Sequence, residues 1–183
     1  NFALSNFDLA YWTGVNVPGM DQPGIFTSPE IIIALRNSFL IAGSAAIICG
    51  IFGLIVGYAV VRLPGSLISA YLRQISFLPY LMPGLAFAAA FLSLFAVSRG
   101  PIPALYGSLS LLILVMVVTY LPYASRSGIS AMMQVGQEPE EAGMVLGAGF
   151  WRRIFKILAP LQKSALVVAI ILPFITGMKE LSL

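Results

Sequence analysis

Two groups of charged side chains in this sequence could do chemistry. Three glutamates lie within four residues, at positions 138, 140 and 141, and Lys179 stands beside Glu180 at the end of a long apolar run. Carboxylate oxygens suit hard cations. The chain has no histidine and one cysteine, Cys49, so the commonest metal ligand and the usual base for a nucleophile are missing. The sequence therefore predicts neither a catalytic residue nor a metal site, and an enzyme is the least favoured class.

The composition indicates the surroundings in which these groups lie. Hydrophobic residues make up 59% of the 183 residues and charged residues 9%, against roughly 25% charged residues in a soluble domain. Because so few charges cannot cover a soluble fold of this size, the apolar side chains must face lipid or other helices. The net charge of +3 comes from basic residues scattered between apolar runs, unlike the basic stripe of a protein that binds nucleic acid.

Four apolar runs are candidates for membrane crossing, which needs about 20 residues. They cover about residues 37–61, 74–98, 104–125 and 161–183, and the last run is cut off by the end of the chain. Lipid offers no partner for backbone polar groups, so these runs must be helical. We predict an all-α, polytopic transmembrane helical bundle. Residues 1–36 would lead into it from outside the membrane, and we expect the chain to be a fragment, open at both ends.

Two of these runs carry features that affect helix packing. In the first run, Gly50, Gly53 and Gly57 share one face, which permits close approach of another helix. In the second run, two prolines four residues apart predict a bend or a break. This break is either a kink that serves packing or a part of a transport path. The path candidates at the break are Pro79, Tyr80, Pro83 and Gly84.

The distribution of basic residues predicts the orientation of the chain. If the polar connector after the third run is cytoplasmic, seven basic residues lie inside and two lie outside, as the positive-inside rule requires. The seven are Arg62, Arg73, Arg126, Arg152, Arg153, Lys156 and Lys163, and the two are Arg36 and Arg99. The first segment, with its acidic residues, would then face outward.

The connector, residues 126–160, is the most unusual part of the sequence. Pro139 and the three glutamates suit the first turn of a helix, and Gly147 suits its end. A second, amphipathic helix follows from Phe150, and Pro160 is expected to end it. The first of these helices has only about two turns, so it is marginal alone. The rest of the chain offers little cytoplasmic mass, so we expect a soluble partner to pack against it.

This connector resembles the signature loop of the permease subunits of binding-protein-dependent, ATP-driven (ABC) importers. That loop reads Glu-Ala-Ala, three residues, Gly, nine residues, then Ile-x-Leu-Pro. Here Glu141-Ala142-Gly143, Gly147 and Ile157-Leu158-Ala159-Pro160 stand at the same spacing. Gly143 replaces the second alanine and Ala159 replaces the leucine, and both exchanges are small.

The resemblance implies a set of roles and partners. A coupling helix from Glu138 to Leu146 would dock in a separate ATPase subunit, which would bind the ATP, and this chain would hold no cofactor. An extracytoplasmic substrate-binding protein, a second permease half or copy, and the lipid of the inner membrane are the other implied partners, and no nucleic acid is among them. The implied coupling residues are Glu138, Glu140, Glu141, Ala142, Gly143, Leu146, Gly147, Ile157 and Pro160.

Two further segments resemble ferric-iron permeases, and in particular the carboxy-terminal half of such a protein. They are Ser76 to Gly84 and Met178 to Ser182. Ferric iron is therefore the cargo that the resemblance implies, while polyamine, thiamine and phosphonate permeases share the same loop. Lys179 and Glu180 are either path residues or groups near the outer interface, where Lys179 can extend toward water.

Two other classes remain open on the residues alone. A secondary transporter would need intramembrane carboxylates, but the first three runs contain no charge. A structural membrane subunit would leave the glutamate loop unexplained.

Overall fold

The computed structural model describes residues 10–14 and 24–179. Asp8 and Asp21 of the predicted outer segment, and the path candidate Glu180, lie outside the described residues. The chain divides into two compact units, residues 1–40 and residues 41–183, and the following paragraphs treat each unit by itself.

The first unit contains α1 (Ala10–Thr13) and the beginning of α2 (Pro29–Arg62). Trp12 packs against Phe26 with ring centroids 5.4 Å apart. Pro29 suits the first turn of α2, where its missing N–H costs nothing, and Glu30 complements the positive end of the helix dipole. The helix therefore begins earlier than the first apolar run, inside the segment that we predicted as a lead-in.

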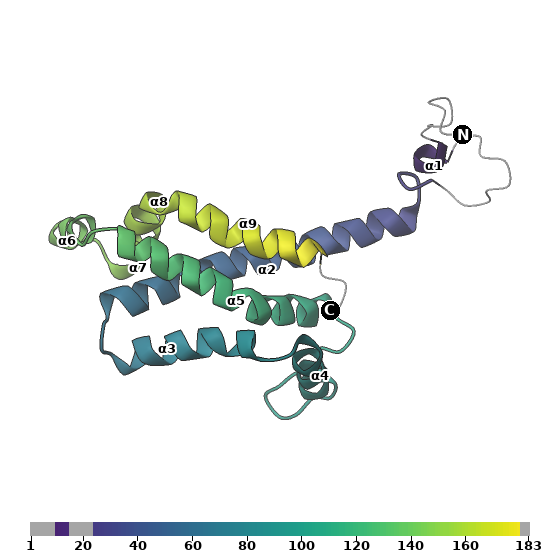
Figure 1. Cartoon of the computed structure of the whole chain (residues 1–183), viewed down its shortest axis with the longest axis horizontal. Helices are drawn as coiled ribbons and strands as arrows, with labels where there is room; N and C mark the ends of the chain where they lie inside the picture. The colour runs from purple at the N-terminus through teal and green to yellow at the C-terminus, as the bar shows by residue number, and fades with distance from the viewer. Residues whose placement is uncertain (1–9, 15–23, 180–183) are drawn as a thin grey trace. The chain divides into compact units, whose positions relative to one another are not determined.

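The second unit is a bundle of the remainder of α2 with α3 (Leu67–Phe77), α4 (Gly84–Phe95), α5 (Leu109–Gln134) and α9 (Lys163–Lys179). In Figure 1, α9 and α3 run alongside α5, and both pairs are in contact. The central core cluster joins small residues of α2 to larger ones of α5. It contains Ala42, Ala45, Cys49, Met116, Val117, Tyr120 and Ala124.

The close approach predicted from the glycines of α2 is confirmed. A Cβ atom on Gly53 would lie 2.5 Å from the carbonyl oxygen of Ala124, and a Cβ atom on Gly57 would clash with the carbonyl of Gly128. On α5, a Cβ atom on Gly128 would clash in turn with the carbonyl of Gly53. The two backbones touch, so only glycine fits at these crossings. By contrast, a Cβ atom on Gly43 would meet nothing within 4 Å.

The predicted break in the second run is confirmed. After α3 the chain forms a 3-10 turn, η2 (Leu78–Leu81), and α4 then leaves at 110° to the preceding segment. Met82 is extended, with φ −94° and ψ 135°, because the ring of Pro83 disfavours a helical conformation in the residue before it. The stretch 74–98 is therefore not one straight crossing but the end of one helix followed by another.

Helix α5 extends beyond the third predicted run, which ended at residue 125. It continues to Gln134, so Arg126 lies inside the helix, about two turns before its end. Arg73, which lies between the first and second predicted runs, is likewise part of a helix, α3. Both basic residues are thus part of the helical bundle.

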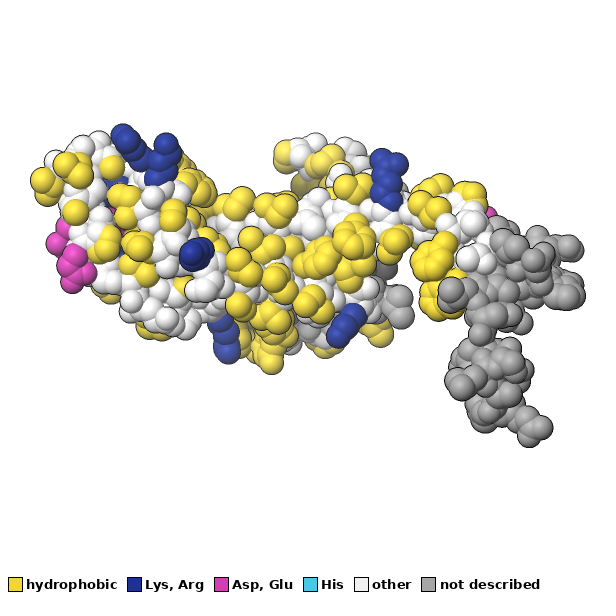
Figure 2. All heavy atoms as spheres, turned by 90° about the horizontal axis from the view of Figure 1, so that it is seen from above, with side chains coloured by type: hydrophobic (Ala, Val, Ile, Leu, Met, Phe, Trp, Pro, Cys, Tyr) yellow, Lys and Arg dark blue, Asp and Glu magenta, His cyan; other side chains and the backbone are white. Residues whose placement is uncertain are grey.

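Two helices, α2 and α5, are long and apolar enough to cross a membrane, and the number rises to four if each of two bent pairs counts as one span. Figure 2 shows apolar side chains spread over the middle of the face in view, with the larger acidic group at the end that carries the polar loop. This distribution fits a bundle whose sides meet lipid or other helices.

Candidate functional site

The first helix of the polar loop, α6 (Glu138–Val145), forms as predicted. Pro139 lies in its first turn together with acidic side chains. At its end Gly147 has φ +74°, and its N–H donates to the carbonyl of Met144 over 2.9 Å. The N–H of Ala148 donates to the carbonyl of Gly143, also over 2.9 Å. This left-handed turn satisfies carbonyls that the helix end leaves open.

The carboxylate of Glu140 is the centre of the site, and it is 4% exposed. The hydroxyl of Tyr58 donates to Oε1 over 2.7 Å, and Nε of Arg62 donates to Oε2 over 3.2 Å. Nε of Arg153 donates to Oε1 over 3.4 Å. One buried anion thus binds two cations and a phenol, which is the hydrogen-bonded pairing that a buried charge needs.

The two arginines extend this network to the backbone of other elements. Nη2 of Arg62, at the end of α2, donates to the carbonyls of Val135 over 3.0 Å and Gly136 over 2.7 Å, just after α5. Nη1 of Arg153 donates to the carbonyl of Ala148 over 3.1 Å. The ends of α2 and α5, α6 and the helix after it are therefore fixed to one another through the side chain of Glu140.

Apolar contacts support the same arrangement. The ring of Phe150 meets Tyr58 edge to face, with centroids 5.4 Å apart. Gly143 is buried, and a Cβ atom there would lie 2.5 Å from Cδ1 of Ile157. The glycine that departs from the Glu-Ala-Ala pattern thus lets α6 lie closely against the following helix.

The opposite side of α6 has no cover from the described residues. Glu141 and Ala142 are exposed, and Val145 and Leu146 are 88% and 86% exposed. We expected little of the chain itself to pack against α6, and in the structure Arg62, Arg153 and Ile157 cover one of its faces. The other face ends in exposed apolar side chains, and the binding of a partner there stays a prediction.

The second helix of the loop runs through α7 (Phe150–Arg153), a π-helical stretch η3 (Ile154–Leu158) and α8 (Ala159–Leu161). It ends at Leu161, one residue beyond the end that we predicted at Pro160, and the π-helical stretch just before Pro160 accommodates the missing N–H and the bulk of the ring. Helix α9 then leaves at 86°. Ile154 and Leu158 bury their side chains against Leu54 and Met132.

The candidates for a transport path lie in two separate places. At the break, Tyr80 stacks on Phe77 and meets Tyr123 edge to face, with centroids 6.1 Å apart. Pro79, Pro83 and Gly84 shape the break itself. Lys179 is the exposed last residue of α9, and no described hydrogen bond or ion pair joins it to the break. The role of these residues in a path stays a prediction.

The described residues contain no group of three or more His, Cys, Asp or Glu side chains that could hold a metal ion. Tyr58, Arg62 and Arg153 belong to the site although the sequence did not indicate them as members of it. A signal for the first two was available, since Tyr58 and Arg62 are four residues apart and so share one face at the end of α2. Their partner could not be read from the sequence, because Glu140 is 78 residues beyond Arg62.

The fold and this site define a multi-pass helical membrane protein in which a short polar-loop helix is fixed to the end of the bundle. Residues 50–183 match the family of binding-protein-dependent transport system inner membrane components, and the chain belongs to that family. It is thus a part of a transport system of the inner membrane and not an enzyme, as the sequence predicted.

The chain is similar to several named permease proteins. The chain is 29% identical over 167 residues to the sulfate transport system permease protein CysT of Escherichia coli, which covers 85% of this chain and 58% of that protein. It is 29% identical over 152 residues to the putative ferric transport system permease protein FbpB 1 of Haemophilus influenzae, covering 81% of this chain and 23% of that protein. It is 26% identical over 155 residues to the molybdate/tungstate transport system permease protein WtpB of Pyrococcus abyssi, covering 83% and 58%. The chain thus spans a little more than half the length of the sulfate and molybdate/tungstate relatives and about a quarter of the ferric one.

The contribution of Glu140 to the local stability of α6 can be measured by substitution. Replacing Glu140 by Gln removes the negative charge and leaves two guanidinium groups without a counter-charge. We expect α6 to lose about 2 kcal/mol of local stability, so that its amides exchange roughly 30 times faster. Hydrogen exchange of the assembled transporter, followed by mass spectrometry, measures this.

The matched control is Glu141→Gln, at the exposed neighbouring position, where we expect a change within about 0.5 kcal/mol. Equal acceleration of exchange in the two variants would show that Glu140 has no special role.

Proposed function

We propose that this chain is the membrane-spanning permease subunit of an ATP-driven importer and that α6 is its coupling helix. A separate ATPase subunit would bind α6, and an extracytoplasmic binding protein would deliver the cargo. The observation that carries the proposal is the two-sided character of α6. One face is fixed to the bundle through Glu140, and the other presents the exposed side chains of Val145 and Leu146.

This arrangement suits the transmission of a movement. A helix that only bound a partner would not need a buried charge network on its other face. A helix fixed to the bundle but polar all over would give a partner little apolar area to hold, and burial of apolar area drives association. With both properties, a partner can bind the exposed face of α6, and a movement of α6 is transmitted to the bundle through the fixed face.

The proposed coupling is tested with two loop variants, Glu141→Lys and Gly147→Pro. The first reverses a charge on the exposed face, and the second is incompatible with φ +74° because proline holds φ near −65°. We expect membrane insertion to persist while uptake per ATP hydrolysed falls roughly tenfold or more. Uptake and ATPase activity of the assembled transporter in proteoliposomes measure this.

Gly149→Pro provides the matched control. Gly149 has φ −64°, and a Cβ atom there would meet nothing within 4 Å, so proline fits two residues away from the sensitive position. Normal coupled uptake by both Glu141→Lys and Gly147→Pro would contradict the assignment of α6.

For the cargo we propose ferric iron. The proline break from Ser76 to Gly84 and the segment around Lys179 resemble ferric-iron permeases, and relatives from Haemophilus influenzae and Actinobacillus pleuropneumoniae are named as ferric transport permeases. Sulfate is the second candidate, supported by the similarity to CysT. Polyamine, thiamine and phosphonate have no named relative among the matches given above.

The choice of cargo is tested by uptake of labelled ferric iron and labelled sulfate into cells that carry the complete transporter or lack it. We expect iron uptake to depend on the transporter and sulfate uptake to be independent of it. Transporter-dependent sulfate uptake without iron uptake would overturn the iron assignment and leave the coupling proposal intact.

A further inference from the structure

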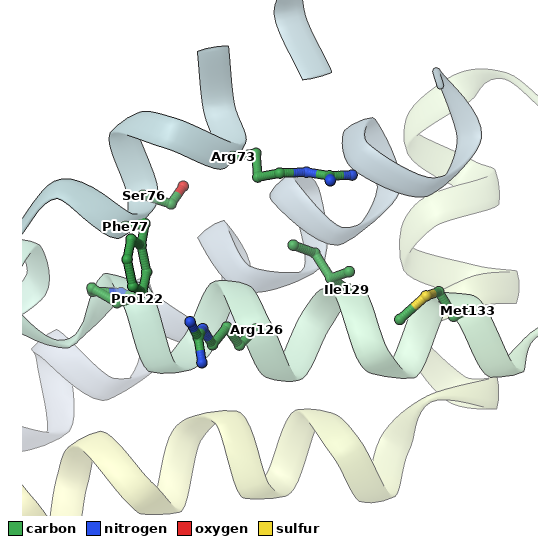
Figure 3. A pocket seen from close by; sticks show the side chains of 7 residues that line it. All are labelled: Arg73, Ser76, Phe77, Pro122, Arg126, Ile129 and Met133. Atoms are coloured by element: carbon green, nitrogen blue, oxygen red, sulfur yellow. The ribbon is translucent and has the colours of Figure 1, made fainter. Parts of the chain in front are cut away.

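A cavity between α3 and α5 is lined by Arg73 and Arg126, which both lie inside helices. Its volume is about 360 Å³. Arg73 and Ser76 project from the α3 side, and Arg126 and Ile129 from the α5 side, as Figure 3 shows. The rest of the lining is apolar and consists of Phe77, Pro122 and Met133.

The charges of this cavity are not balanced by any described residue. Both ion pairs among the described residues go to Glu140, from Arg62 and Arg153. Arg126 lies over the ring of Phe77, with Cζ 4.8 Å from the ring centroid. That contact covers one flat side of the guanidinium but leaves its N–H groups, which lie in the plane, without an acceptor. Arg73 makes no described hydrogen bond or ion pair.

The two arginines lie within their helices, and both side chains are exposed. Arg73 is six residues from the start of α3, and Arg126 is eight residues from the end of α5. At 1.5 Å per residue, they lie about 9 and 12 Å along their helices from the end of the bundle that carries α6. Ionisable residues on membrane helices usually pair with another group, so two exposed cations without a described anionic partner mark a candidate ligand site.

The third polar side chain of the cavity, Ser76, does not donate a hydrogen bond into it. Its hydroxyl already donates to the carbonyl of Leu72 over 2.5 Å, so it has no proton left to donate to a ligand. The cavity therefore offers many donors, two positive charges and no described carboxylate. This set suits an anion whose several oxygens accept hydrogen bonds from a planar guanidinium fork.

We propose that Arg73 and Arg126 form a binding site for a phosphate-type oxyanion group between α3 and α5. The group could be a free anion, such as inorganic phosphate or sulfate, or the phosphate of a lipid headgroup, because both present the same oxygens. Phe77, Pro122 and Ile129 form an apolar wall beside the two arginines. The site does not depend on the identity of the cargo.

Two readouts on the purified permease–ATPase complex test the site. Native mass spectrometry counts the phospholipid that stays bound, and calorimetry measures binding of inorganic phosphate against chloride at equal ionic strength. We expect one of these ligands to bind the wild type. We expect Arg73→Gln and Arg126→Gln each to weaken its binding about tenfold, or to remove the bound lipid.

The control is Arg152→Gln, which removes an exposed charge of α7 outside the cavity and is expected to change neither readout. If a glutamine variant fails to assemble, Arg73→Lys and Arg126→Lys keep the charge and lose the bidentate fork, and they should still bind more weakly than wild type. Phosphate binding identifies a free anion as the ligand, and retained phospholipid identifies a headgroup.

The proposal is overturned if the wild type binds neither ligand, since a carboxylate from the second permease half would then be the partner of the arginines. It is also overturned if Arg152→Gln weakens binding as much as the cavity variants do, because the effect would then be one of general surface charge.

Discussion

The structure of the polar loop depends on one buried anion. The carboxylate of Glu140 holds two arginines and a tyrosine that come from α2 and α7. A helix of eight residues is marginally stable by itself, and the exposed end of α6 is apolar. Without the contacts of Glu140, no other described polar interaction would fix the position of α6 on the bundle. Removing the carboxylate would also leave Arg62 and Arg153 close together without a counter-charge. The network therefore fixes both the conformation of α6 and its direction relative to the bundle.

The membrane bundle makes this network possible by bringing α2 and α5 into backbone contact. Gly53 and Gly57 face Ala124 and Gly128 at distances that no larger residue allows. Further along, the end of α2 comes so close to the end of α5 that Arg62 reaches the carbonyls of Val135 and Gly136. A displacement of α6 would therefore act on two helices at once. Close glycine packing and a buried charge network are parts of one mechanical connection.

Features set by local sequence were predictable, and those set by distant partners were not. The start of α6 at Pro139, its end at Gly147 and the break at Pro83 follow from the conformations that these residues permit or exclude. The partners of Glu140 could not be found this way, because Arg62 is 78 residues away. Arg73 and Arg126 flank the predicted apolar runs, whereas the structure places both within helices that line the cavity between α3 and α5. At Pro160 the helix ends within one residue of the predicted position, after a π-helical stretch that no local pattern indicated.

We expect α6 and the end of α2 to move as one body when ATP binds to the proposed partner ATPase. The distance between spin labels at Val145 and Leu63, both exposed, reports this movement, with Cys49 replaced by alanine so that no other thiol of this sequence reacts. The distance is measured by pulsed electron paramagnetic resonance in the assembled transporter, without nucleotide and with ATP. If α6 and α2 move together, one narrow distribution is the same in both states. A distribution that shifts or splits on ATP binding would show instead that α6 moves independently of α2.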